Sequence, residues 1–142
     1  MISLSINNIK DFMSKLLKAE TFDDFDLHSL TIHNFACFEI NKIPTEPPPG
    51  WRAIRPHAFD IIKAANKPSY IKLVLAIPAH MLEIENSTPF LNIVFEGDKI
   101  LITSGISQKT FTLDRSAHTK LNSFILQFLT QNNIGYTNEL KE

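Results

Sequence analysis

The chain of 142 residues is poor in cysteine, in glycine and in net charge, and each scarcity excludes a class of protein. Cys37 is the only cysteine, so a framework of internal disulfides is excluded. Four glycines are present, and none lies in a glycine-rich motif that cradles phosphate. The formal net charge of −1 excludes a strongly basic molecule, so any contact with a phosphate backbone has to come from a local patch.

Residues that can carry chemistry are present, but none has the spacing of a known site. The five histidines show no metal-ligand spacing. The acidic stretch from Glu20 to Asp26 lacks the glycine and the terminal glutamate of a calcium loop. We expect it to be a solvated connector that its two phenylalanines, Phe22 and Phe25, hold in place. Ser104 and Ser107 have no activating base beside them in the sequence and are typical of turn residues. We therefore predict no catalytic residue, no metal site and no cofactor.

No apolar run reaches the length that spans a bilayer, and the first residues lack a charged segment followed by an apolar one. We therefore expect a cytoplasmic protein that makes no membrane contact. The composition, 44% hydrophobic and 20% charged, is ordinary for a globular protein, and residues 1–142 are expected to form a single domain.

The stretch from Phe90 to Leu113 is the part in which strand pairing can be worked out. Gly97 and Asp98 have the composition of a type II′ hairpin turn, with glycine supplying the positive φ. This turn predicts the cross-strand pairs Glu96–Lys99, Phe95–Ile100, Val94–Leu101, Ile93–Ile102 and Asn92–Thr103. A second loop is expected at Gly105–Gln108, followed by a third strand that ends at Leu113.

Alternating apolar residues predict a strand at 2–6, and a near-continuous apolar run predicts a central strand at 70–78. A short edge strand is expected at 134–136. Residues 27–43 are too many for one ordinary strand, so we expect either two strands that separate near His33 and Asn34 or one long bent strand. Cys37 falls in this apolar alternation and is expected to be buried. His28 and His33 are five residues apart, which places them on opposite faces of a regular strand.

Three stretches have helical character. Residues 9–17 carry an amphipathic stripe behind a cap at Asn7 or Asn8. After the proline-rich connector 44–50 and a turn over 51–55, a second helix is expected to have Pro56 in its first turn. A C-terminal helix is expected at about 115–131. The predicted fold class is α+β, with a mostly antiparallel sheet of about six strands and helices packed chiefly on one face.

The order of these elements resembles a single domain of the DNA sliding clamp family, the bacterial polymerase processivity factor. The resemblance covers about residues 1–113 and is carried by ISLSINNIKDFMSKLLK and FEGDKILITSGISQKTFTL. The chain has one such domain where a clamp chain has two or three, and it adds the proline-rich connector and the C-terminal helix. The whole chain also resembles an uncharacterised family of small bacterial proteins, through WRAIRPHAFDIIK, KPSYIKLVL and SQKTFTLDR.

The clamp resemblance implies that two helices of the domain face nucleic acid. Counting Arg52, Arg55, Lys63 and Lys67 against Asp60, the second helical region has a local charge of +3. The resemblance makes Lys15, Lys18, Arg52, Lys63 and Lys67 the candidate nucleic-acid-binding residues. Such contacts with phosphates would be independent of base sequence and sensitive to salt.

The expected function is therefore that of a non-catalytic interaction protein that contacts nucleic acid or an acidic partner through basic helix faces. Two alternatives stay open. One is a homo-oligomeric protein-interaction module without a nucleic-acid role, which uses an open sheet edge or the last helix as its interface. The other is an enzyme whose site is assembled from residues that are distant in the sequence.

Overall fold

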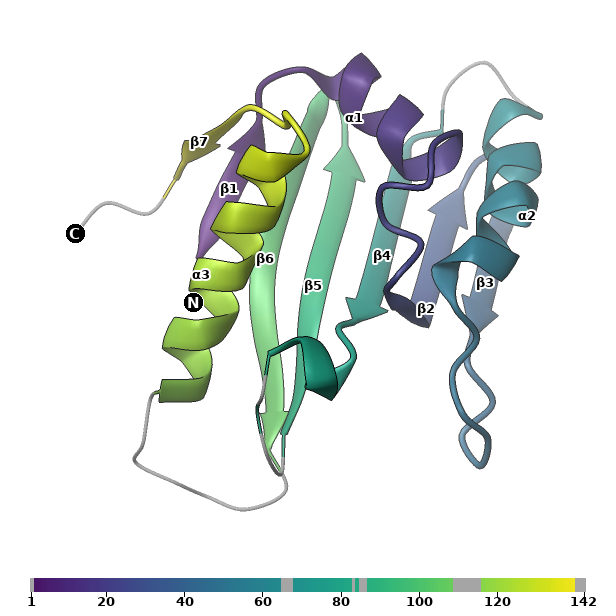
Figure 1. The fold of residues 1–142 in the computed structure, drawn as a ribbon. Helices are drawn as coiled ribbons and strands as arrows, with labels where there is room; N and C mark the ends of the chain where they lie inside the picture. Colours follow the sequence, from purple (N-terminus) through teal and green to yellow (C-terminus); the bar gives the residue numbers. More distant parts are fainter. Residues whose placement is uncertain (1, 65–67, 83, 85–86, 109–115, 140–142) are drawn as a thin grey trace.

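The computed structural model describes residues 2–64, 68–82, 84, 87–108 and 116–139. The elements are β1 (Ser3–Ile6), α1 (Ile9–Leu17), β2 (Asp26–His33), β3 (Cys37–Asn41), α2 (Trp51–Lys63), β4 (Tyr70–Ala76), the 3-10 turn η1 (Ala79–Met81), β5 (Ser87–Glu96), β6 (Lys99–Gln108), α3 (Ser116–Gln131) and β7 (Tyr136–Asn138). The strands form one antiparallel sheet in the order β3-β2-β4-β5-β6-β1-β7, and the three helices cover one of its faces (Figure 1). The predicted α+β fold is confirmed, with seven strands in the described residues.

The β5–β6 hairpin has the predicted register. All five predicted cross-strand pairs are found, and Gly97 turns the chain with a φ of 64°. The loop predicted at Gly105–Gln108 is wrong, because β6 continues through these residues and Gly105 lies opposite Phe90. β5 begins at Ser87 and therefore supplies backbone partners as far as Gln108. The third strand predicted over residues 109–113 lies outside the described residues.

The N-terminal strand and helix form where the sequence predicts them. The side chain of Asn8 accepts a hydrogen bond from the backbone N–H of Asp11 at 3.0 Å, which caps α1. Phe12, Leu16 and Leu17 point toward the sheet and are buried. An isolated helix of nine residues is only marginally stable in water. Burial of this apolar stripe against the sheet therefore stabilises α1.

The second helix begins earlier than predicted. α2 starts at Trp51, so Pro56 lies inside the helix rather than in its first turn. Because proline has no N–H, the carbonyl of Arg52 loses its helical partner, but Arg52 is exposed and water can bind there. Trp51 and Ala58 are buried, and Trp51 Nε1 donates to the carbonyl of Leu16 at 2.9 Å. This tertiary packing offsets the lost bond and fixes the start of α2 against the end of α1.

Aromatic rings hold the acidic connector between α1 and β2, as predicted. Phe22 and Phe25 are buried. Their rings contact those of Phe12, Phe124 and Phe128, with centroid distances between 5.0 and 6.1 Å. Since Phe124 and Phe128 belong to α3, this cluster joins the connector to the C-terminal helix.

The helices leave the other face of the sheet open (Figure 1). His28 and His33 both contact aromatic rings of this face, Phe90 at 4.9 Å and Tyr70 at 5.1 Å between ring centroids. The prediction that the two histidines point to opposite faces is therefore wrong. A β-bulge at the start of β2 adds one residue between them and reverses the alternation.

Candidate interaction surface

The structure brings together only part of the predicted nucleic-acid-binding set. Lys15 Nζ lies 2.8 Å from Asp11 Oδ2 and donates to the carbonyl of Asn133 at 3.0 Å. Its side chain is only 22% exposed, so Lys15 holds α1 against the residues that follow α3. Lys67 lies outside the described residues.

The other three residues of the set lie along one side of α2. Lys18 Nζ and Lys63 Nζ lie 5.6 and 5.0 Å from the centre of the Phe59 ring. Arg52 precedes Phe59 by about two helical turns and therefore lies on the same side of α2. Lys18, Arg52 and Lys63 thus share a surface formed by the end of α1 and the exposed side of α2.

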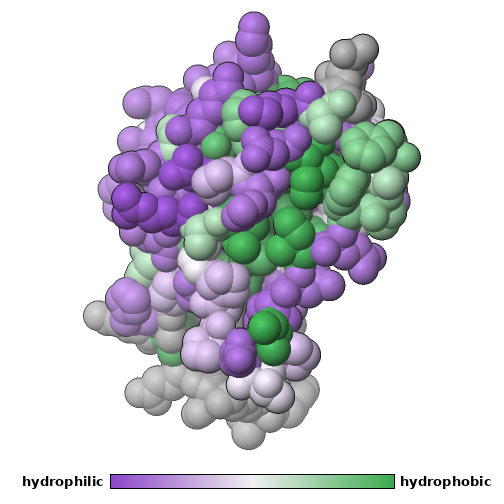
Figure 2. All heavy atoms as spheres, turned by 90° about the vertical axis from the view of Figure 1, so that its right-hand side faces the viewer, coloured by the Kyte–Doolittle hydropathy of each residue, from purple (hydrophilic) through white to green (hydrophobic). Residues whose placement is uncertain are grey.

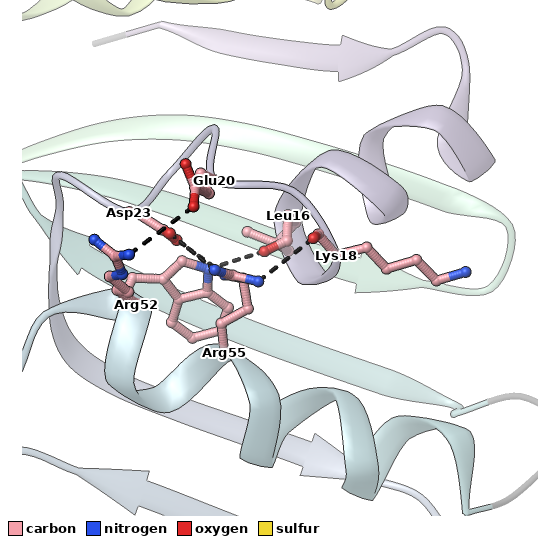
Figure 3. Close-up of polar contacts among 7 residues, drawn as sticks. Leu16, Lys18, Glu20, Asp23, Arg52 and Arg55 are labelled. Atoms are coloured by element: carbon pink, nitrogen blue, oxygen red, sulfur yellow. Dashed lines mark hydrogen bonds and ion pairs between the residues drawn. The ribbon is translucent and has the colours of Figure 1, made fainter.

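Carboxylates compensate most of this positive charge. Asp60 Oδ1 lies 3.3 Å from Lys63 Nζ. Glu20 Oε1 lies 4.0 Å from Arg52 Nη2, as Figure 3 shows. All four side chains are more than half exposed, so each pair contributes less than about 1 kcal/mol to stability. The shared surface therefore carries little net positive charge.

One ion pair beside this surface is largely buried, and sequence reasoning missed it. Arg55 Nε and Nη2 each donate to the Asp23 carboxylate at 2.9 Å (Figure 3). The two side chains are 15% and 9% exposed, and hydrogen bonding to Asp23 raises the pKa of Arg55 above its usual value. The pair joins the acidic connector to α2 and so has a structural role. Its two members are far apart in the chain, and no spacing links them.

The outer side of β3 offers an unpaired strand edge. The backbone N–H of Lys42 donates to the carbonyl of His28 at 3.2 Å, so the even-numbered residues of β3 direct their backbone groups toward β2. Cys37, Glu39 and Asn41 therefore direct their N–H and C=O groups away from the sheet. Within the described ranges, β3 ends the strand order on this side.

Cys37 is exposed, so the prediction of a buried thiol is wrong. Cys37 pairs with His33, and strand alternation places it with Glu39 on the open face of the sheet. Phe38 and Ile40 point to the helix face and are partly buried against the core. The predicted alternation is therefore present in β3, but the side chains that point to the core are Phe38 and Ile40, and Cys37 points the other way.

Hydrophobic side chains flank this strand. Phe35 is 71% exposed and Ile43 is 57% exposed, and the Phe35 ring lies 5.3 Å from the Phe38 ring in an edge-to-face contact. Figure 2 faces this side of the molecule and shows hydrophobic atoms at the surface beside the hydrophilic helix layer. We call β3 together with Phe35 and Ile43 the β3 edge surface.

A separate cleft of about 310 Å³ lies where β2 begins and β4 ends. Its lining includes Asp26, His28, Lys42 and Phe90. Burial raises the pKa of Asp26, and the nearby His80 opposes that shift. Among the described residues, no side-chain hydrogen bond or ion pair joins Asp26, His28 and Lys42 to one another. The cleft thus gathers titratable groups whose proximity cannot be seen in the sequence, and none of the three activates another as a nucleophile.

Metal-binding and membrane-spanning features were also sought in the part of the chain that the structure describes. No three His, Cys, Asp or Glu side chains there lie close enough together to hold a metal ion. No helix there is both long and apolar enough to cross a membrane.

Comparison with known proteins identifies a family. No curated protein and no solved structure matches the chain. A family of unknown function, DUF5721, matches residues 45–137, which run from the proline-rich connector into β7. This match covers more than half of the chain. The chain therefore belongs to DUF5721, a family of unknown function.

Proposed function

We propose that the protein is a non-catalytic interaction module that docks an extended protein segment on the β3 edge surface. The observation that carries the proposal is the row of outward backbone groups at Cys37, Glu39 and Asn41, flanked by the exposed side chains of Phe35 and Ile43. An edge strand of this kind accepts an added strand through main-chain hydrogen bonds, while flanking side chains select the partner.

The composition of β3 supports docking rather than avoidance of it. Natural edge strands are commonly protected by proline, by lysine, by a bulge or by a covering element. β3 contains neither proline nor lysine and pairs regularly with β2 over all of its five residues. Its one charged residue is Glu39.

A proline at Glu39 tests the proposal. The N–H of Glu39 points away from β2, so Glu39→Pro removes an outward donor and leaves the β2–β3 hydrogen bonds in place. The matched control Glu39→Gln removes the charge and keeps the N–H. Affinity capture from the source cells, followed by mass spectrometry, should recover the same partners with wild type and Glu39→Gln and lose them with Glu39→Pro. Circular dichroism checks that every variant is folded.

Two results would contradict docking at β3. The first is a folded Glu39→Pro chain that keeps every partner of the wild type. The second is a wild-type chain that captures no protein, a second copy of itself included.

A second candidate function is contact with a phosphate backbone by a clamp-like domain. It is favoured by the convergence of Lys18 and Lys63 on the ring of Phe59, with Arg52 on the same side of α2. Lys15 and Lys67 complete the set that the clamp resemblance suggests. Retention on a DNA column should fall steeply as salt rises. Lys18→Glu/Lys63→Glu should abolish this retention, and equal retention of that variant and wild type would exclude the surface.

A further inference from the structure

We infer that the extended segment that docks on β3 is β3 of a second copy, paired antiparallel across a two-fold axis. The inference rests on the proposed function, because it names the partner of the same surface. It joins two sheets into one continuous sheet and keeps the helices of both copies on the same face.

The geometry of β3 restricts how two copies can pair. Residues directly opposite each other in an antiparallel pair point to the same face of the sheet. Phe38 and Ile40 point to the helix face, whereas Cys37, Glu39 and Asn41 point to the open face. Even-numbered residues must therefore meet even-numbered residues, and a single residue must lie on the two-fold axis.

Three registers pair at least three residues of β3, with Phe38, Glu39 or Ile40 on the axis. With Phe38 on the axis, Ile40 and Asn41 would lie opposite Ala36 and Phe35, which belong to the bend between β2 and β3 and not to a strand, so this register is set aside.

Charge then separates the other two registers. With Glu39 on the axis, two carboxylates lie directly opposite each other, which is destabilising. With Ile40 on the axis, Ile40 meets Ile40 of the second copy and Glu39 meets Asn41 of the second copy. No like charges are opposed in this register, so we assign the axis to Ile40.

The Ile40 register also covers Ile43, one of the two exposed hydrophobic side chains of the β3 edge surface. Cys37 lies opposite Ile43 of the second copy, which covers a side chain that is 57% exposed in the single copy. Phe38 lies opposite Lys42 of the second copy, whose methylene groups can pack on the ring. The two Glu39–Asn41 pairs supply about four backbone hydrogen bonds, since each such pair exchanges both of its bonds.

The helix layer adds to the contact. The side chain of Asn34, in the turn between β2 and β3, donates to the carbonyl of Ile61 at 2.7 Å, so α2 is held against this end of the sheet. Ile54, Ile61 and Ile62 of α2 are only partly buried against the core. Since both copies carry their helices on the same face, the two α2 helices approach each other above the paired β3 strands.

Cysteine cross-linking tests the register. Opposite residues without mutual hydrogen bonds have Cα atoms about 4.5 Å apart, within the range of a disulfide. In the Cys37→Ser background, Ile40→Cys should therefore form an intermolecular disulfide under mild oxidation and run as a dimer on a non-reducing gel. The matched variant Glu39→Cys, in the same background, should cross-link at least about tenfold more slowly.

A second cross-linking variant changes an exposed residue and leaves the residues packed against the core unchanged. Ile43 is exposed, so Ile43→Cys in the otherwise wild-type chain should fold normally and form two disulfides per dimer with Cys37 of the second copy. Light scattering on the reduced wild-type chain should show a dimer, and Glu39→Pro should show a monomer.

Each outcome has a distinct meaning. Faster cross-linking of Glu39→Cys than of Ile40→Cys would overturn the assigned register. A wild-type chain that stays monomeric at high concentration, with no cross-linked variant, would overturn self-pairing altogether. If Glu39→Pro lost a captured protein other than a second copy, docking on β3 would still stand. Failure of self-pairing is therefore distinguishable from failure of the proposed function.

Discussion

The buried ion pair between Arg55 and Asp23 makes the sharpest prediction about stability. Replacement of Arg55 by methionine leaves the Asp23 carboxylate, 9% exposed, without two charge-assisted hydrogen bonds. Removal of one partner of a buried pair costs about 3–5 kcal/mol. Because some water reaches this site, we expect Arg55→Met to lower the free energy of unfolding by about 3 kcal/mol.

Urea denaturation measures this loss. With a slope of about 2 kcal/mol per molar, the midpoint should fall by about 1.5 M while the slope stays unchanged. Arg52→Met is the matched control from the same helix. Its partner Glu20 lies 4.0 Å away and both side chains are largely exposed, so the control should change stability by less than about 0.5 kcal/mol. Equal midpoints for the two variants would refute the structural role of the buried pair.

Two further predictions concern polar side chains, the partly buried Asp26 and the buried Ser104. Burial raises the pKa of Asp26, so the folded state binds the proton of this carboxyl group more tightly than the unfolded state does. Asp26→Asn should therefore raise the free energy of unfolding at neutral pH. This gain should vanish below the ordinary pKa of 3.8, where Asp26 is protonated in both states. Urea titrations at about pH 3 and pH 7 check this, and an equal gain at both would contradict it. Ser104 Oγ accepts from the N–H of Ile2 at 3.1 Å and donates to Asn122 at 3.0 Å, so Ser104→Ala should cost about 1–3 kcal/mol. Thermal unfolding measures the loss, and Ser104→Ala with wild-type stability would disprove it.

Local signals predicted those parts of the fold that local interactions determine. Gly97 requires a positive φ and thereby sets the register of the β5–β6 hairpin, and Asn8 caps α1 with its own side chain. The errors arose where a distant element overrides the local signal. Gly105 has turn chemistry but extends β6, because β5 is long enough to pair with it. Pro56 disfavours a helix locally, yet α2 continues through it because Trp51 and Ala58 are buried.

The candidate surfaces were harder to predict than the fold. The basic residues and Asp60 were visible in the sequence, but the pairing of Arg52 with Glu20 was not, since Glu20 lies in the connector between α1 and β2. The β3 edge surface depends on strand order, and neither periodicity nor composition reveals which strand ends a sheet. Even the exposure of Cys37 depends on the phase of an alternation that only pairing with β2 determines.

The two edges of the sheet differ in what they offer to a second chain, and this difference favours β3. β7 has three residues, and the N–H of Glu139 donates to the carbonyl of Ser3, so the residue that follows β7 is also tied to β1. Glu139 also lies 3.9 Å from Lys99, which adds charge to that edge. β3 has five regularly paired residues, and exposed aromatic and aliphatic side chains flank it. Since main-chain hydrogen bonds supply affinity in strand addition and flanking side chains supply specificity, β3 meets both requirements and β7 meets neither in full.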